Sequence, residues 1–184
     1  MISKCIIVHG CPSTNRDDSY SKHWMPWVAK QLQAKGISVE LPIMPEPWSP
    51  NYDNFEKVFN KYDVDENTVL VGHSCGCAFL VNWLGKSSTS IKKLILVAPW
   101  KVNDHEGDVG RDVFYGFNID TNIKERVGEI TMFTADDEES SGKESLEMYH
   151  RALGGEIIEL SGRGHYTLTD MGTEEFPEIL DKIV

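Results

Sequence analysis

Short runs of apolar residues alternate with amphipathic segments along most of the chain. The apolar runs at 5–9, 37–41, 68–71, 91–98, 130–135 and 157–160 are rich in β-branched residues and predict strands. Between them, apolar residues recur at spacings of three and four, which predicts helices at 22–35, 55–62, 75–84, 146–153 and 176–183. This alternation favours an α/β fold, with a mainly parallel sheet of about six strands and helices on both faces.

The pattern fails between positions 99 and 128. Charged residues crowd the first part of this segment, and its aromatic residues show no clear periodicity. We expect an irregular segment that lies over one end of the sheet.

The composition narrows the class of protein. A chain of 184 residues, 40% of them hydrophobic, fits one domain spanning 1–184. The formal charge of −11 argues against nucleic acid and an anionic membrane surface as partners. The apolar run near the N-terminus is too short for a signal or a membrane span and is interpreted as a strand. Cys5, Cys11, Cys75 and Cys77 lack paired zinc spacing, so we expect reduced thiols, no metal or cofactor, and a cytoplasmic location.

The segment Gly72-His73-Ser74-Cys75-Gly76 lies between a predicted strand and a predicted helix. Glycines on both sides of the serine let a strand and a helix pack closely, which leaves the serine exposed at the top of the strand. Such a pentapeptide occurs by chance in about one chain of this composition in ten, so by itself it is weak evidence for a catalytic serine. The strand before it and the helix after it are the context that a nucleophile elbow requires.

Two further side chains complete a candidate catalytic triad. A serine hydroxyl needs an imidazole to take its proton, and the imidazole needs an acid to orient it. Asp137 follows the fifth predicted strand and His165 the sixth, so the carboxyl ends of parallel strands would bring both to Ser74. Asp136 is the alternative acid; the side chains of adjacent residues diverge, and we prefer Asp137.

The transition state also needs N–H donors for its oxyanion. The backbone of Cys75 and that of Cys11, which follows His9-Gly10, are the candidates. Their Cα atoms should then lie near disulfide range, roughly 4.4 to 6.8 Å. Two outcomes are open: an oxidant could join the cysteines and switch hydrolysis off, or their side chains point apart as small apolar fillers. We expect the second outcome.

Aromatic residues near this end of the sheet are candidates for the substrate pocket. A small pocket of this kind would prefer acyl chains of two to about six carbons, whereas packing in a satellite core is the alternative role for these residues. The candidates are Trp100, Phe114, Tyr115, Phe117 and Tyr166.

Taken together, these motifs resemble the small single-domain serine hydrolases around retinoblastoma-binding protein nine and their bacterial relatives. The resemblance covers nearly the whole chain and implies a compact α/β-hydrolase fold without a large cap domain. It also implies a triad of Ser74, the second aspartate of the pair, Asp137, and His165. Here Glu138 and Glu139 follow the pair, where relatives often have proline and an apolar residue, which leaves Asp136 and Asp137 open. The motifs are Val8-His9-Gly10, His23-Trp24-x-x-Trp27, Pro42-x-Met44-Pro45-x-Pro47, the serine pentapeptide, Asp136-Asp137 and Gly164-His165-Tyr166.

Two functions fit these features. The first is a serine hydrolase that cleaves small-molecule esters or amides through an acyl-enzyme. The second is a protein-interaction module on a vestigial hydrolase fold, which the name of the family suggests. We prefer the first, because every triad residue type and both oxyanion positions are present in the expected order. A protein partner is not readable from the sequence.

Overall fold

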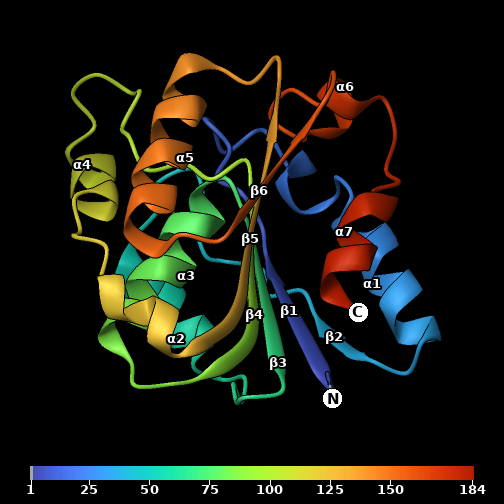
Figure 1. The fold of residues 1–184 in the computed structure, drawn as a ribbon. Coiled ribbons are helices and arrows are strands. Elements are labelled where there is room, and N and C mark those ends of the chain that lie inside the picture. Colours follow the sequence, from blue (N-terminus) through green and yellow to red (C-terminus); the bar gives the residue numbers. More distant parts are fainter. Residues whose placement is uncertain (1) are drawn as a thin grey trace.

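The computed structural model describes residues 2–184 and shows a parallel sheet with helices on both faces (Figure 1). The six strands follow the order β2-β1-β3-β4-β5-β6, and all neighbouring strands pair in parallel. This arrangement confirms the predicted architecture. The strands are β1 (Lys4–Val8), β2 (Ser38–Glu40), β3 (Thr68–His73), β4 (Ile91–Val97), β5 (Val127–Ala135) and β6 (Glu156–Leu160).

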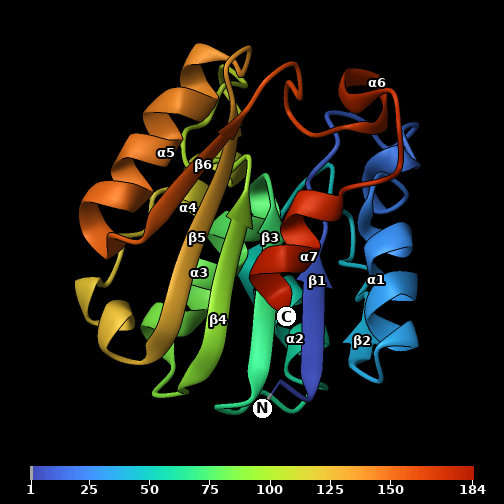
Figure 2. The ribbon, with the colours of Figure 1, turned by 45° about the vertical axis from the view of Figure 1, so that its right-hand side comes forward.

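Alternate side chains of the central strands enter two separate cores. Ile6 and Leu70 contribute to the core beneath α2 (Tyr52–Phe59), α3 (Cys75–Lys86) and α5 (Ser140–Leu153). Cys5 and Val69 contribute to the core beneath α1 (Met25–Ala34) and α7 (Pro177–Ile183). Figure 2 shows α1 and α7 on one side of the sheet and α3 and α5 on the other. Because both faces are covered, the central strands read as continuous apolar runs.

The segment expected to be irregular contains a helix, so this prediction was wrong in part. Helix α4 spans Val109–Tyr115, and a 3-10 turn spans Thr121–Glu125. The carboxylate of Asp108 caps α4 by accepting a hydrogen bond from the Arg111 N–H at 3.0 Å. Helix α4 has only seven residues and buries one short face, with charged residues preceding it. Its apolar residues are therefore too few to show a helical period in the sequence.

One helix begins later than the sequence predicts, and one short helix was not predicted. Helix α1 begins at Met25, which puts Pro26 in its first turn, where no N–H is needed. The four-residue helix α6 (Leu168–Met171) was not predicted; its cap, Thr167 Oγ1, accepts from the Asp170 N–H at 3.2 Å. Among the described residues, no helix combines the length and the apolar character needed to cross a membrane.

Helix α3 approaches the sheet closely at its first turn. A Cβ atom on Gly76 would lie 2.5 Å from the carbonyl oxygen of Val8 and 2.6 Å from that of His9. On Gly72, it would lie 2.8 Å from the backbone of Cys77. Both glycines are therefore required for α3 to begin directly above the ends of β1 and β3.

We expect Gly76→Ala to lower the free energy of unfolding by about 1–3 kcal/mol, because the added methyl group must push α3 away from a rigid backbone. Gly85→Ala on the same helix is the matched control: its Cβ would make an ordinary contact, 3.4 Å from Asp120 Cβ. Urea denaturation of both variants measures the difference. Equal stability of the two variants would contradict this account of the packing.

Candidate active site

The candidate site lies where the strand order reverses direction. From β1 the chain first adds β2 on one side and then β3 on the other, so the loops after β1 and β3 diverge at this point. In open parallel sheets, ligands bind in the crevice at the carboxyl ends of such strands. Cys11 follows β1 and Ser74 follows β3, so both lie at this position.

Ser74 occupies a sharp turn between β3 and α3. Its φ of 52° and ψ of −121° lie in a region that non-glycine residues rarely adopt. The Ser74 N–H donates to the carbonyl of Val97 at 3.0 Å, and its own carbonyl accepts from the Cys77 N–H at 3.0 Å. Backbone strain of this kind persists where the surrounding structure enforces it, and it is concentrated at functional sites. The residue is 8% exposed, and its hydroxyl faces a cavity.

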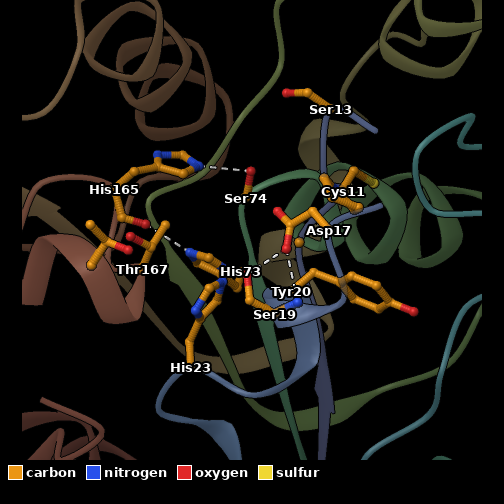
Figure 3. A pocket seen from close by; sticks show the side chains of 13 residues that line it. Cys11, Ser13, Asp17, Ser19, Tyr20, His23, His73, Ser74, His165 and Thr167 are labelled. Carbon is orange, nitrogen blue, oxygen red and sulfur yellow. Dashed lines mark hydrogen bonds between the residues drawn. The ribbon is translucent and has the colours of Figure 1, made fainter. Parts of the chain in front are cut away.

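His165 brings its imidazole to this hydroxyl from the loop after β6. The Ser74 Oγ–H donates to His165 Nε2 at 2.8 Å, as Figure 3 shows. The loop is fixed behind the ring, because the hydroxyl of the buried Tyr166 donates to the Thr134 carbonyl at 2.7 Å. The serine and histidine predicted from the sequence are therefore in direct contact.

The carboxylate beside His165 belongs to Glu138. His165 Nδ1–H donates to Glu138 Oε2 at 3.0 Å, and Oε1 lies 3.2 Å from the same nitrogen. The Glu138 side chain is only 1% exposed. It passes over Gly142, where a Cβ atom would lie 2.7 Å from Glu138 Cγ and Cδ. Its Oε1 also accepts from the Glu139 N–H at 2.9 Å, which fixes the carboxylate in place.

Neither aspartate of the pair contacts the His165 ring, so the placement of Asp137 was wrong. Asp137 Oδ1 accepts from the Gly164 N–H at 2.9 Å. Asp136 accepts from the Gly162 N–H and the Ser161 hydroxyl, both at 2.8 Å, and the bond from Gly162 is the main cause of its lowered pKa. Both aspartates thus brace the loop that presents His165. The longer glutamate side chain reaches the ring from one position further along the chain.

The two cysteines proposed as oxyanion positions are joined by a disulfide. Cys11 and Cys75 have Cα atoms 5.6 Å apart. The expectations of four reduced thiols and of diverging side chains at this pair were therefore wrong. Cys5 and Cys77 are free and buried, and burial raises the pKa of each thiol. The N–H of Cys75 belongs to the first turn of α3, where backbone donors have no partner within the helix.

Two buried histidines that lie within the sequence motifs, His9 and His73, support the loops around Ser74. His73 Nε2–H donates to the His165 carbonyl at 2.8 Å, and burial holds the pKa of His73 well below its ordinary value. His9 Nδ1–H donates to the Gly10 carbonyl at 2.7 Å, and its Nε2 accepts from the Met44 N–H at 2.9 Å. Burial lowers the pKa of His9 to about 4. Both histidines are part of the sequence motifs, but only the fold shows what they contact.

Two adjoining cavities open on either side of Ser74 and His165. The first has a volume of about 270 Å³ and carries polar side chains from the loop after β1, including Asp17, Tyr20 and His23 (Figure 3). The second has a volume of about 320 Å³ and includes Asp104 and Arg111. Polar and charged side chains therefore surround the serine.

Only two of the five predicted pocket aromatics line these cavities. Trp100 and Tyr115 line the second cavity. The rings of Trp100 and His165 pack edge to face, with their centroids 5.0 Å apart. Phe114 and Tyr166 are buried in the two cores, so their alternative role in core packing is correct. Phe117 packs beneath the Lys101 ammonium, 4.1 Å from its ring centroid, outside both cavities.

Within residues 2–184, no group of three or more His, Cys, Asp or Glu side chains is arranged to hold a metal ion. The chemistry that the site itself can perform is that of a serine activated by an imidazole and a buried carboxylate.

Comparisons with known proteins identify the fold and the family of this chain. The putative hydrolase YdeN of Bacillus subtilis (strain 168) is 31% identical over 86 residues, which span 46% of this chain and 43% of that protein, less than half of either. The crystal structure of the B. subtilis ydeN gene product superposes with a TM-score of 0.84 and 22% identity, covering 98% of this chain and 96% of that one. Est1E from Butyrivibrio proteoclasticus superposes with a TM-score of 0.64 and 14% identity, covering 99% and 88%.

These structural similarities establish the α/β-hydrolase fold. A model of the family described as serine hydrolase matches residues 5–183, nearly the whole chain. The chain therefore belongs to the serine hydrolase family.

Proposed function

We propose that this hydrolase cleaves small ester or amide bonds through an acyl-enzyme formed on Ser74, with His165 as base and Glu138 as the orienting acid. One observation carries the proposal. Ser74 Oγ lies 2.8 Å from His165 Nε2, and the opposite nitrogen of the same ring lies 3.0 Å from a buried carboxylate oxygen. These distances are within the range for proton transfer in a serine triad.

His165 Nε2 accepts and returns a proton in both halves of the reaction. Neutral His165 accepts the Ser74 proton at Nε2 as the serine oxygen attacks the substrate carbonyl carbon. Glu138 accepts from Nδ1–H, which fixes the tautomer and stabilises the imidazolium that forms. The imidazolium then protonates the leaving group. In the second half, His165 takes a proton from water as the water oxygen attacks the acyl carbon. The imidazolium then returns that proton to Ser74 Oγ as the bond to the acyl group breaks and the acid is released.

The oxyanion of each tetrahedral intermediate would lie between the backbone N–H groups of Cys75 and Cys11. Cys75 begins α3, so the positive end of the helix dipole faces the same position. The Cα separation of 5.6 Å supports this proposal, because it is short enough for both N–H groups to reach one oxygen atom.

The cavities support a small, polar substrate rather than an alkyl chain. Charged and hydroxyl-bearing side chains lie on both sides of Ser74, and three of the five aromatics expected to form an apolar pocket lie elsewhere. Burying an alkyl chain there would remove polar groups from water without replacing their hydrogen bonds. We therefore expect polar groups flanking the scissile carbonyl.

The alternative function, protein interaction on a vestigial site, does not explain why the triad contacts are assembled. The negative charge still argues against nucleic acid as a partner. The cytoplasmic location rested on four reduced thiols; the disulfide removes that support, and the location stays a prediction.

Ser74→Ala should abolish labelling by a fluorophosphonate probe and lower the rate of hydrolysis of p-nitrophenyl acetate by about 10⁴ to 10⁶. The hydroxyl faces a cavity, so its removal leaves the core intact. Ser88→Ala, at an exposed serine before β4, is the control and should label as the wild type does. Labelling of the Ser74→Ala protein would disprove the assignment of the nucleophile.

Glu138→Gln should lower kcat by about 10³ to 10⁴, because an amide cannot hold the histidine tautomer or stabilise the imidazolium. Asp137→Asn and Asp136→Asn should each cost about tenfold or less, because they only loosen the loop that carries His165. Steady-state kinetics of the three variants, with circular dichroism to verify folding, gives the ranking. If Asp137→Asn were the most damaging, the acid would be assigned one residue too far along the chain.

The polar cavities predict that an acyl group with a hydroxyl is hydrolysed more efficiently than an alkyl group of equal length, by roughly tenfold in kcat/KM. Esters of p-nitrophenol with 3-hydroxybutyrate and butyrate make this comparison with one leaving group. Long acyl chains, such as palmitate, should be poor substrates. Efficient hydrolysis of palmitate esters would show that an apolar tunnel exists.

A further inference from the structure

The Cys11–Cys75 disulfide connects the two backbone segments that would form the oxyanion hole. The cysteines are 64 residues apart in the sequence; Cys11 lies in the loop after β1, and Cys75 is the first residue of α3. The triad itself does not need a covalent link between these loops. The following inference rests on the function proposed above.

The two ends of the bridge differ in how firmly the protein holds them. Cys75 is fully buried in the first turn of α3, beside Gly76, which packs against the backbone of β1. Cys11 begins a long loop in which residues 13–18 are exposed. Beyond Cys11, Arg111 Nη2 donates to the Pro12 carbonyl at 3.1 Å. The disulfide is thus the direct link between the well-fixed donor and the donor on the exposed loop.

The bridged form is also the form in which the nucleophile is assembled. With the disulfide in place, the Ser74 hydroxyl still lies 2.8 Å from His165 Nε2. The sequence left open that joining the cysteines would displace the N–H donors and switch hydrolysis off. The bridge coexists with the Ser74–His165 contact, which favours the opposite role for it.

We propose that the Cys11–Cys75 disulfide positions the two oxyanion donors, so that its reduction slows acyl transfer while leaving the fold intact. Reduction breaks the S–S bond and requires two electrons and two protons. A dithiol such as dithiothreitol supplies both, becomes a cyclic disulfide and leaves two cysteine thiols. Cys11 is partly exposed and lines both cavities, so a small dithiol can reach it.

The expected loss is confined to the chemical step. Removing one oxyanion donor outright costs about 10² to 10³ in kcat, and a displaced donor costs less, so we expect a fall of about tenfold. KM should change by less than about twofold, because the donors act on charge that develops only in the transition state. A boronic acid, which forms a tetrahedral adduct with the serine, should bind about tenfold more weakly after reduction.

The test uses the full chain before and after treatment with dithiothreitol. Thiol titration in denaturant should give two thiols from the untreated protein and four after reduction, since Cys5 and Cys77 are free. At each thiol count, kcat, KM and the inhibition constant of phenylboronic acid are measured. Circular dichroism and thermal melting verify that the native fold persists.

Cys11→Ser is the matched control, since it lacks the bridge and keeps the other three cysteines. Its kcat should equal that of the reduced wild type and should not respond to dithiothreitol. Four thiols in the untreated wild type would overturn the inference, as would an unchanged or raised kcat after the count reaches four. An equal response of Cys11→Ser to dithiothreitol would also overturn it. Activity that persists in Ser74→Ala would instead refute the proposed function, so the two failures are distinguishable.

Discussion

The packing of the first turn of α3 against the ends of β1 and β3 is the constraint on which the site depends. With no side chain at Gly72 or Gly76, the helix begins directly above the strands, and the chain must turn sharply at Ser74. That turn places the serine side chain at the cavity and makes Cys75 the first residue of the helix. The positions of the proposed nucleophile and of one proposed oxyanion donor therefore both follow from one close backbone approach.

The sequence was sufficient to predict the fold and the contact between Ser74 and His165. Central strands buried on both faces must be apolar throughout, and such runs are visible without any knowledge of contacts. Ser74 and His165 were identified because each follows a strand, and parallel strands bring their carboxyl ends to one edge. For these residues, position in the topology determines position in space.

The acid could not be identified in the same way, because four consecutive carboxylates, at positions 136–139, follow β5. Which of them meets His165 depends on the path of the turn and on side-chain length. The absence of a side chain at Gly142, four residues beyond Glu138, makes room for the glutamate, and this relation is visible only in three dimensions. The departure at Glu138 from the residues usual among relatives was the available signal. The prediction of the pocket aromatics was wrong in part for a similar reason. An aromatic residue near one edge of the sheet can either line a cavity or pack in a core, and the sequence does not distinguish the two.

In the proposed mechanism His73 has no part in proton transfer, although it is adjacent to Ser74 in the chain. Burial keeps its ring neutral, and the pKa values of His9 and His23 are lowered by burial as well. In the proposed mechanism, the buried imidazoles of His9, His23 and His73 therefore stay uncharged when His165 becomes an imidazolium. A second cation at 5.4 Å, the distance between the ring centroids of His73 and His165, would oppose that step by electrostatic repulsion. Burial of the other histidines thus leaves His165 as the single imidazole near Ser74 that carries a proton in the proposed mechanism.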